Sequence, residues 1–178
     1  ENMVPLARQV GVDAKWLVIE GSDEFFKVTK KFHNALHGRR EEVTADDFEL
    51  FRETSNKIVE ETDIGGDIHM IHDPQPVALI SRKGDLGGDW VWRCHIDVSH
   101  PDQQVWDFLR EFVVGYDSAV FSAPSFAQQL PIRQALIHPS IDPLSDKNKE
   151  LSLSTIDSVL TKYGVDGDKP IITQISRF

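Results

Sequence analysis

Two short clusters of histidine and aspartate are the part of this sequence best suited to chemistry. His72 and Asp73 are adjacent, and His95 and Asp97 are two residues apart. A carboxylate can accept hydrogen bonds from a ligand hydroxyl, and a neighbouring imidazole can donate or accept one. Residues two apart on a strand share one face, so we expect Arg93, His95 and Asp97 to converge on one ligand.

Each cluster also has a purely structural interpretation. Asp73 could cap a short helix that follows it, with His72 half buried beside it. Asp97 could, together with Ser99, cap the next helix, and His95 could be a hydrogen-bonded polar group of the core. These residues alone leave both interpretations open.

A metal-dependent hydrolase is a further alternative, because histidine and carboxylate side chains are common metal ligands. The possible ligands are His69, His72, Asp73, His95 and Asp97. Their neighbours favour strands, however, and His69 and His72 would face opposite ways on an extended chain. The sequence also lacks a glycine-rich phosphate loop and a serine nucleophile elbow. We therefore expect neither a metal nor a cofactor.

Three other residues complete the set of candidates. His33 and Asn34 lie within an expected helix, where most histidines are surface or packing residues. Cys94 alternates with His95, so we expect it to face the opposite way as a small buried side chain. It is the only cysteine, which excludes a disulfide within the chain.

Alternating strands and helices are expected to position these clusters. Apolar spacing predicts helices at 3–10, 25–36, 44–58, 77–80, 105–113 and 153–163, the third of them capped by Thr44. Strands are expected at 14–19, 67–71, 90–96, 118–121, 135–137 and 171–175, with a flexible turn at 84–88 and a linker at 139–143. This order implies a mostly parallel α/β sheet that binds ligands at the carboxyl ends of its strands. Both polar clusters fall there.

The composition of the chain argues against nucleic acids and membranes as partners. The 178 residues carry a formal net charge of -10 at pH 7, whereas a nucleic-acid partner requires a basic face. No apolar run approaches the ~18 residues of a membrane span, and no signal-peptide pattern opens the chain. With one cysteine and no glycosylation sequon, we expect a cytoplasmic protein that binds neither nucleic acid nor membrane.

Five segments resemble those of a known family. They read KKFHNALHG at 30–38, HDPQP at 72–76, WRCHID at 92–97, PSIDPLS at 139–145 and PIITQISRF at 170–178. In this order they are similar to trehalose glycosyltransferring synthase and retaining trehalose phosphorylase. The resemblance implies a GT-B glycosyltransferase with two Rossmann-like lobes. Residues 1–141 would form the amino-terminal, acceptor-binding lobe, and residues 142–178 the linker and the start of the donor-binding lobe.

The resemblance also implies an activity, namely retaining transfer of glucose between a nucleotide diphosphate and glucose to form or cleave trehalose. By motif, Asp73 matches the carboxylate near the reacting sugar and His95 the histidine beside the donor glucose. These two are the expected catalytic residues. The expected substrate-binding residues are His33, Asn34, His72, Gln75, Arg93 and Asp97.

The family pattern extends beyond this sequence. It has a strand and a glycine-rich loop before the segment at Glu1, and a basic pair and a glutamate motif in the second lobe. The resemblance therefore implies a lobe truncated at both ends and inactive alone. An unpaired sheet edge would favour pairing with another copy, so we expect a homodimer. The alternative function is a non-catalytic module, derived from this lobe, for sugar binding or assembly.

Overall fold

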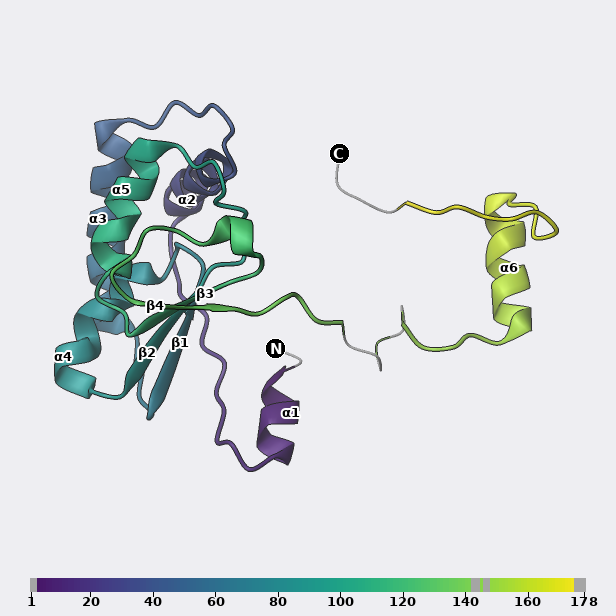
Figure 1. Cartoon of the computed structure of the whole chain (residues 1–178), viewed down its shortest axis with the longest axis horizontal. Helices are drawn as coiled ribbons and strands as arrows, with labels where there is room; N and C mark the ends of the chain where they lie inside the picture. The colour runs from purple at the N-terminus through teal and green to yellow at the C-terminus, as the bar shows by residue number, and fades with distance from the viewer. Residues whose placement is uncertain (1–2, 142–144, 146–147, 175–178) are drawn as a thin grey trace. The chain divides into compact units, whose positions relative to one another are not determined.

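The computed structural model describes residues 3–141, 145 and 148–174, in two compact units, Glu1–His138 and Pro139–Phe178 (Figure 1). The first unit contains helices α1 (Met3–Gln9), α2 (Asp23–Leu36), α3 (Ala45–Glu61), α4 (Lys83–Leu86) and α5 (Gln103–Val113). Its strands are β1 (Ile68–His72), β2 (Asp89–Arg93), β3 (Ser118–Phe121) and β4 (Arg133–Leu136), and two 3-10 helices cover Val77–Arg82 and Pro124–Phe126. The second unit contains α6 (Leu153–Tyr163).

The four strands form one parallel sheet in the order β1-β2-β3-β4. This arrangement confirms the predicted α/β, Rossmann-like fold with flanking helices. In the register of the sheet, His72 of β1 lies beside Arg93 of β2, and Arg93 lies beside Val120 of β3. The carboxyl ends of all four strands therefore meet at one edge.

Local sequence signals determine where the helices begin. The Thr44 hydroxyl accepts a hydrogen bond from the Asp47 amide at 3.3 Å, and the Asp47 carboxylate accepts one from the Thr44 amide at 2.8 Å. This reciprocal capping box starts α3 and confirms the predicted cap. Lys31 of α2 donates to both oxygens of the same carboxylate, at 3.0 and 2.9 Å. The cap of α3 therefore also ties it to α2.

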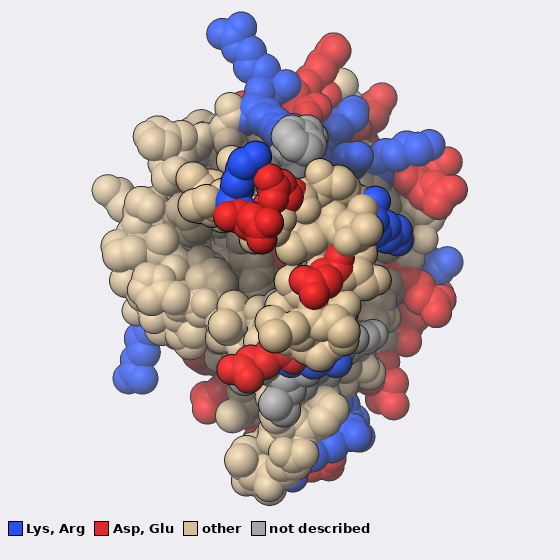
Figure 2. Space-filling view, turned by 90° about the vertical axis from the view of Figure 1, so that its right-hand side faces the viewer, with Lys and Arg blue, Asp and Glu red and all other residues tan. Residues whose placement is uncertain are grey.

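The surface carries charges of both signs. On the face drawn in Figure 2, acidic and basic side chains are interspersed, and neither sign forms one continuous patch. Among the described residues, no helix combines the length and the apolar character needed to cross a membrane.

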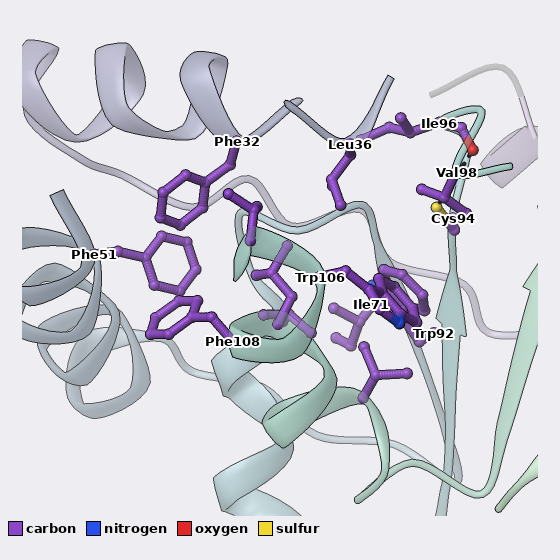
Figure 3. Close-up of a cluster of buried hydrophobic side chains, with 14 of the residues drawn as sticks. Phe32, Leu36, Phe51, Ile71, Trp92, Cys94, Ile96, Val98, Trp106 and Phe108 are labelled. Atoms are coloured by element: carbon purple, nitrogen blue, oxygen red, sulfur yellow. Dashed lines mark hydrogen bonds between the residues drawn. The ribbon is translucent and has the colours of Figure 1, made fainter. Parts of the chain in front are cut away.

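A core of aromatic and aliphatic side chains fills the space between the sheet and three helices, α2, α3 and α5, which lie on the same side of it (Figure 1). Phe32, Phe51 and Phe108 meet where these helices pack together, with ring centroids 5.3 to 5.8 Å apart (Figure 3). Ile71 and Trp92 are register partners on neighbouring strands, and both are buried. This core packs against β1 and β2 next to their polar ends.

Three predicted elements differ in the structure. The strand prediction at 14–19 is wrong, because this segment has no secondary structure and its residues 16–18 are exposed. A strand needs a hydrogen-bonded neighbour, and within the described chain β1 pairs only with β2. The turn predicted at 84–88 begins instead as helix α4. Residues 171–174 form no strand, and Ile175, the end of that prediction, lies outside the described residues.

His69 is a buried histidine whose surroundings disfavour its protonated form. Its ring stacks on Trp90 with centroids 4.2 Å apart, and neither ring nitrogen has a hydrogen-bond partner. Burial lowers the pKa of the His69 imidazole below its ordinary value of 6.5, outweighing the attraction of Asp67.

As the pH falls below about 6.5, the unfolded chain therefore binds this proton more readily than the folded chain does, and stability decreases. We expect the free energy of unfolding, measured in urea, to be lower at about pH 5.5 than at about pH 7.5. In His69→Phe, which keeps a ring against Trp90, this decrease should be smaller. An identical decrease in the variant would contradict the assignment.

Candidate functional site

The carboxyl ends of β1 and β2 bring the two polar clusters together. The Asp73 amide donates to the Arg93 carbonyl at 2.9 Å, so the strands stay paired just past the end of β1. Asp73 itself has a φ of +64°, the left-handed region that aspartate tolerates better than most residues. Such backbone strain is concentrated at functional sites.

The Asp73 carboxylate bridges the two strand ends. Its Oδ1 accepts a hydrogen bond from the His95 amide at 2.8 Å, and the Asp73 carbonyl accepts one from Nε1 of Trp92 at 3.0 Å. Among the described residues, Oδ2 has no hydrogen-bond partner. The short helix Val77–Arg82 has no side-chain cap. The structural interpretation of Asp73 as a helix cap is therefore wrong.

The imidazoles of His72 and His95 form a pair. Nδ1 of His72 lies 2.8 Å from Nε2 of His95, with the ring planes 11° apart and the centroids 5.2 Å apart. Burial first, and then the positive neighbours His95 and Arg93, keep the pKa of His72 below its ordinary value, although Asp73 opposes this. A neutral ring can supply the acceptor that this short contact requires. His95 itself is exposed and accessible to a ligand.

Arg93 is buried beneath this edge. Its Nη2 donates to Oγ of Ser122 at 3.1 Å and to the Ile137 carbonyl at 2.9 Å, whereas its Nη1 is buried without a partner. The guanidinium thus ties the end of β2 to the segments that follow β3 and β4. Its predicted contact with substrate stays a prediction.

Asp97 belongs to a second polar group. Its Oδ1 accepts hydrogen bonds from the amide and the hydroxyl of Ser99, at 3.0 and 2.6 Å. These bonds lower the pKa of the Asp97 carboxyl, and the nearby imidazoles of His37 and His100 lower it further. Helix α5 is capped by a different residue, Asp102, so the helix-cap interpretation of Asp97 is wrong. Because β2 ends at Arg93, strand alternation no longer relates Asp97 to His95.

The end of α2 lies beside this second group. The Asp102 amide donates to the Ala35 carbonyl at 2.9 Å. A Cβ added to Gly38, which has a φ of +78°, would lie 2.8 Å from the His100 carbonyl oxygen, so only glycine fits there. The turn at Gly38 thus brings the last residues of α2 against the loop that follows β2.

The remaining candidates lie on or near these elements. Asn34 donates from Nδ2 to Glu41 at 2.7 Å, and the His33 ring lies edge-on to His37, with centroids 4.8 Å apart. Gln75 is half-buried, two residues after Asp73. The structure brings His72, Asp73 and His95 into direct contact. Binding roles for all the candidates stay predictions.

Sequence reasoning missed several neighbours of the site. Trp16 places its ring 5.6 Å from that of His72, centroid to centroid, although its segment was predicted to be a strand. His37 carries a usable signal, because it lies one helical turn after His33. His100 and Ser122 carry none, because only the fold brings them close.

Cys94 confirms the predicted alternation. It is fully buried, its thiol contacts the Ile96 carbonyl at 3.6 Å, and burial raises its pKa to about 12. Since the thiolate is the reactive form, we expect a thiol reagent such as DTNB to label Cys94 only after unfolding in urea. Rapid labelling of the folded chain would contradict this burial.

Two hollows lie away from the polar edge. One, of about 330 Å³, is lined by Glu20, Ser22 and Lys57, and the other, of about 500 Å³, by Phe48, Arg52 and Asp107. Neither contains any of the predicted site residues. Among the described residues, no three histidine, cysteine or acidic side chains are grouped as metal ligands.

A parallel sheet with helices packed on it and polar residues at its carboxyl edge defines a Rossmann-like α/β lobe, consistent with the amino-terminal lobe of a GT-B glycosyltransferase. The chain belongs to the family described as "Trehalose synthase, N-terminal domain", whose model matches residues 1–128.

Relatives match beyond that domain. The chain is 47% identical to trehalose synthases of Thermococcus litoralis and Pyrococcus furiosus over 181 aligned positions, which cover 99% of the chain. It is 39% identical to the trehalose synthase of Rubrobacter xylanophilus over 185 positions. The chain spans about 44% of the length of these relatives.

Proposed function

We propose that this chain is the acceptor-binding part of a retaining glucosyltransferase that forms or cleaves trehalose with glucose and nucleotide-diphosphate glucose. The observation that carries the proposal is the contact among His72, Asp73 and His95 at the carboxyl edge of the sheet. Similarity to proteins named trehalose synthase over 99% of the chain supports the choice of sugar.

The chemistry of this edge suits a neutral, hydroxyl-rich ligand. Oδ2 of Asp73 can accept a hydrogen bond from a sugar hydroxyl, and Nδ1 of the exposed His95 offers a second polar contact. Both groups are held in place before a ligand arrives, because the His95 amide binds Oδ1 of Asp73 and the His95 ring contacts His72. Such fixed polar groups can orient a sugar for reaction and stabilise the charge that develops on it.

Sugar binding and glucose transfer are proposed to need different parts of a longer protein. The relatives named trehalose synthase are more than twice as long as this chain, which spans 44% of them. We propose that the nucleotide-sugar site and the transfer step depend on the rest of such a protein, that the whole protein acts in the cytoplasm, and that it pairs as a homodimer. This chain alone is then a sugar-binding lobe without turnover.

A sugar titration tests the proposal. We expect glucose or trehalose to bind this chain in calorimetry or NMR, and His95→Ala to weaken that affinity about tenfold through loss of hydrogen bonds at the site. His138→Ala, a change at an exposed histidine, is the control and should bind as the wild type does. No binding of either sugar would overturn the proposed function. Rapid glucose transfer by this chain alone would overturn the proposal that transfer depends on the rest of a longer protein.

A further inference from the structure

We infer that His72 is a positioning residue: its Nδ1 accepts a hydrogen bond from Nε2–H of His95, which leaves Nδ1 of His95 unprotonated as the acceptor that faces the ligand. The inference deepens the proposed function and rests on it for the identity of the ligand. It assigns His72 a role through His95 instead of the direct substrate contact expected from the sequence.

The distance and the ring planes show that the two imidazoles act together. Nδ1 of His72 and Nε2 of His95 are 2.8 Å apart, within the range of a short hydrogen bond. The two ring planes are nearly parallel, with an angle of 11° between them. At this distance one nitrogen must carry a proton and the other must not. The contact therefore fixes which nitrogen of His95 remains for a ligand, namely Nδ1.

The surroundings of His72 favour the neutral acceptor. The side chain is half-buried, Trp16 lies against its ring, and the buried guanidinium of Arg93 is its register neighbour. A second positive charge beside Arg93 is unfavourable, so His72 is better suited to accept than to carry an added proton. A neutral imidazole in water also favours the tautomer with its proton on Nε2. With the proton on Nε2 of both rings, both are in the favoured form and the short contact is satisfied.

The backbone of His95 is also held in place. The His95 amide donates to Asp73, so the backbone of His95 is fixed at 2.8 Å from the residue next to His72. Rotation of the His95 side chain is the remaining freedom, and the bond to His72 removes it. An acceptor nitrogen at Nδ1 suits a sugar hydroxyl, which donates a hydrogen bond.

NMR of the imidazole nitrogens tests this without any sugar. At about pH 7.5, where an ordinary histidine is neutral, we expect the 15N shift of His95 Nδ1 to be that of an unprotonated nitrogen. His72→Leu should shift it towards the average of two exchanging tautomers. His72→Asn places a carbonyl oxygen near the position of Nδ1 and should restore the wild-type shift. A protonated Nδ1 in the wild type, or an unchanged shift in His72→Leu, would overturn the inference.

Sugar affinity supplies the second measurement. We expect His72→Leu to weaken glucose binding roughly tenfold and His72→Asn by at most about threefold, because one hydrogen bond is lost in the first and replaced in the second. Thermal unfolding of each variant shows that it is folded. Equal weakening in both folded variants would overturn the role of the Nδ1 acceptor. Absence of sugar binding in the wild type, with the tautomer result intact, would overturn the proposed function but leave His72 as the residue that positions His95.

Discussion

Asp73→Asn should separate sugar binding from folding at this site. Asparagine tolerates the left-handed backbone at φ +64° and keeps an oxygen for the His95 amide, so we expect the free energy of unfolding to change by less than about 0.5 kcal/mol. The charge at Oδ2 is lost. Because hydrogen bonds to charged groups contribute about 1.5–3 kcal/mol, glucose affinity should fall roughly ten- to a hundredfold.

Asp73→Ala provides the matched comparison. It removes the acceptor for the His95 amide as well as the charge, so we expect a further loss of about 1–3 kcal/mol of unfolding free energy in addition to the loss of binding. Urea unfolding and a glucose titration of both variants measure the two effects separately. Wild-type affinity in folded Asp73→Asn would show that this carboxylate does not contact the sugar.

Trp92→Ala should give the largest loss of stability among the site's supporting residues. Trp92 is fully buried, with its ring centroid 6.3 Å from that of Trp106 and 6.0 Å from that of Phe121. Its Nε1 also donates to the Asp73 carbonyl at 3.0 Å. We expect the free energy of unfolding to fall by about 3–5 kcal/mol, through lost packing and the cavity left behind.

One variant separates the hydrogen bond of Trp92 from its packing, and a second variant, at Trp16, is the control. Trp92→Phe keeps most of the ring but loses the hydrogen bond to Asp73, so we expect a smaller cost of about 1–3 kcal/mol. Trp16→Ala changes an exposed tryptophan and should alter the free energy of unfolding by less than about 0.5 kcal/mol. Urea unfolding gives all three values. A cost for Trp92→Ala no larger than that for Trp16→Ala would contradict the packing described here.

Much of the fold follows from local patterns. The apolar spacing of Phe25, Val28 and Phe32 predicts α2, and the Thr44 cap marks the start of α3, because both signals act within a few residues. Strands depend on partners distant in the sequence. The segment at 14–19 has a strand-like composition but pairs with no strand in the part of the chain that the structure describes, and composition alone could not reveal that.

The site likewise combines features that local sequence predicts with features that depend on residues distant in the sequence. Adjacency of His72 and Asp73, and their place after an apolar strand, predicted a polar edge at the sheet. The contact between Nδ1 of His72 and Nε2 of His95 depends on the pairing of β1 with β2 and on side-chain rotation, so the sequence could not predict it. Arg93 is buried and bonded to the segments that follow β3 and β4, which its own neighbours in the sequence do not reveal, and its contact with substrate stays a prediction.

Backbone amide shifts during a trehalose or glucose titration test the central claim most directly, because they locate the bound sugar on this chain. We predict that the largest shifts occur at His72, Asp73 and His95. Smaller shifts should appear at the end of α2, and the hollow lined by Phe48, Arg52 and Asp107 should not respond. Shifts confined to that hollow, or none at saturating sugar, would contradict a sugar site at the carboxyl edge of the sheet.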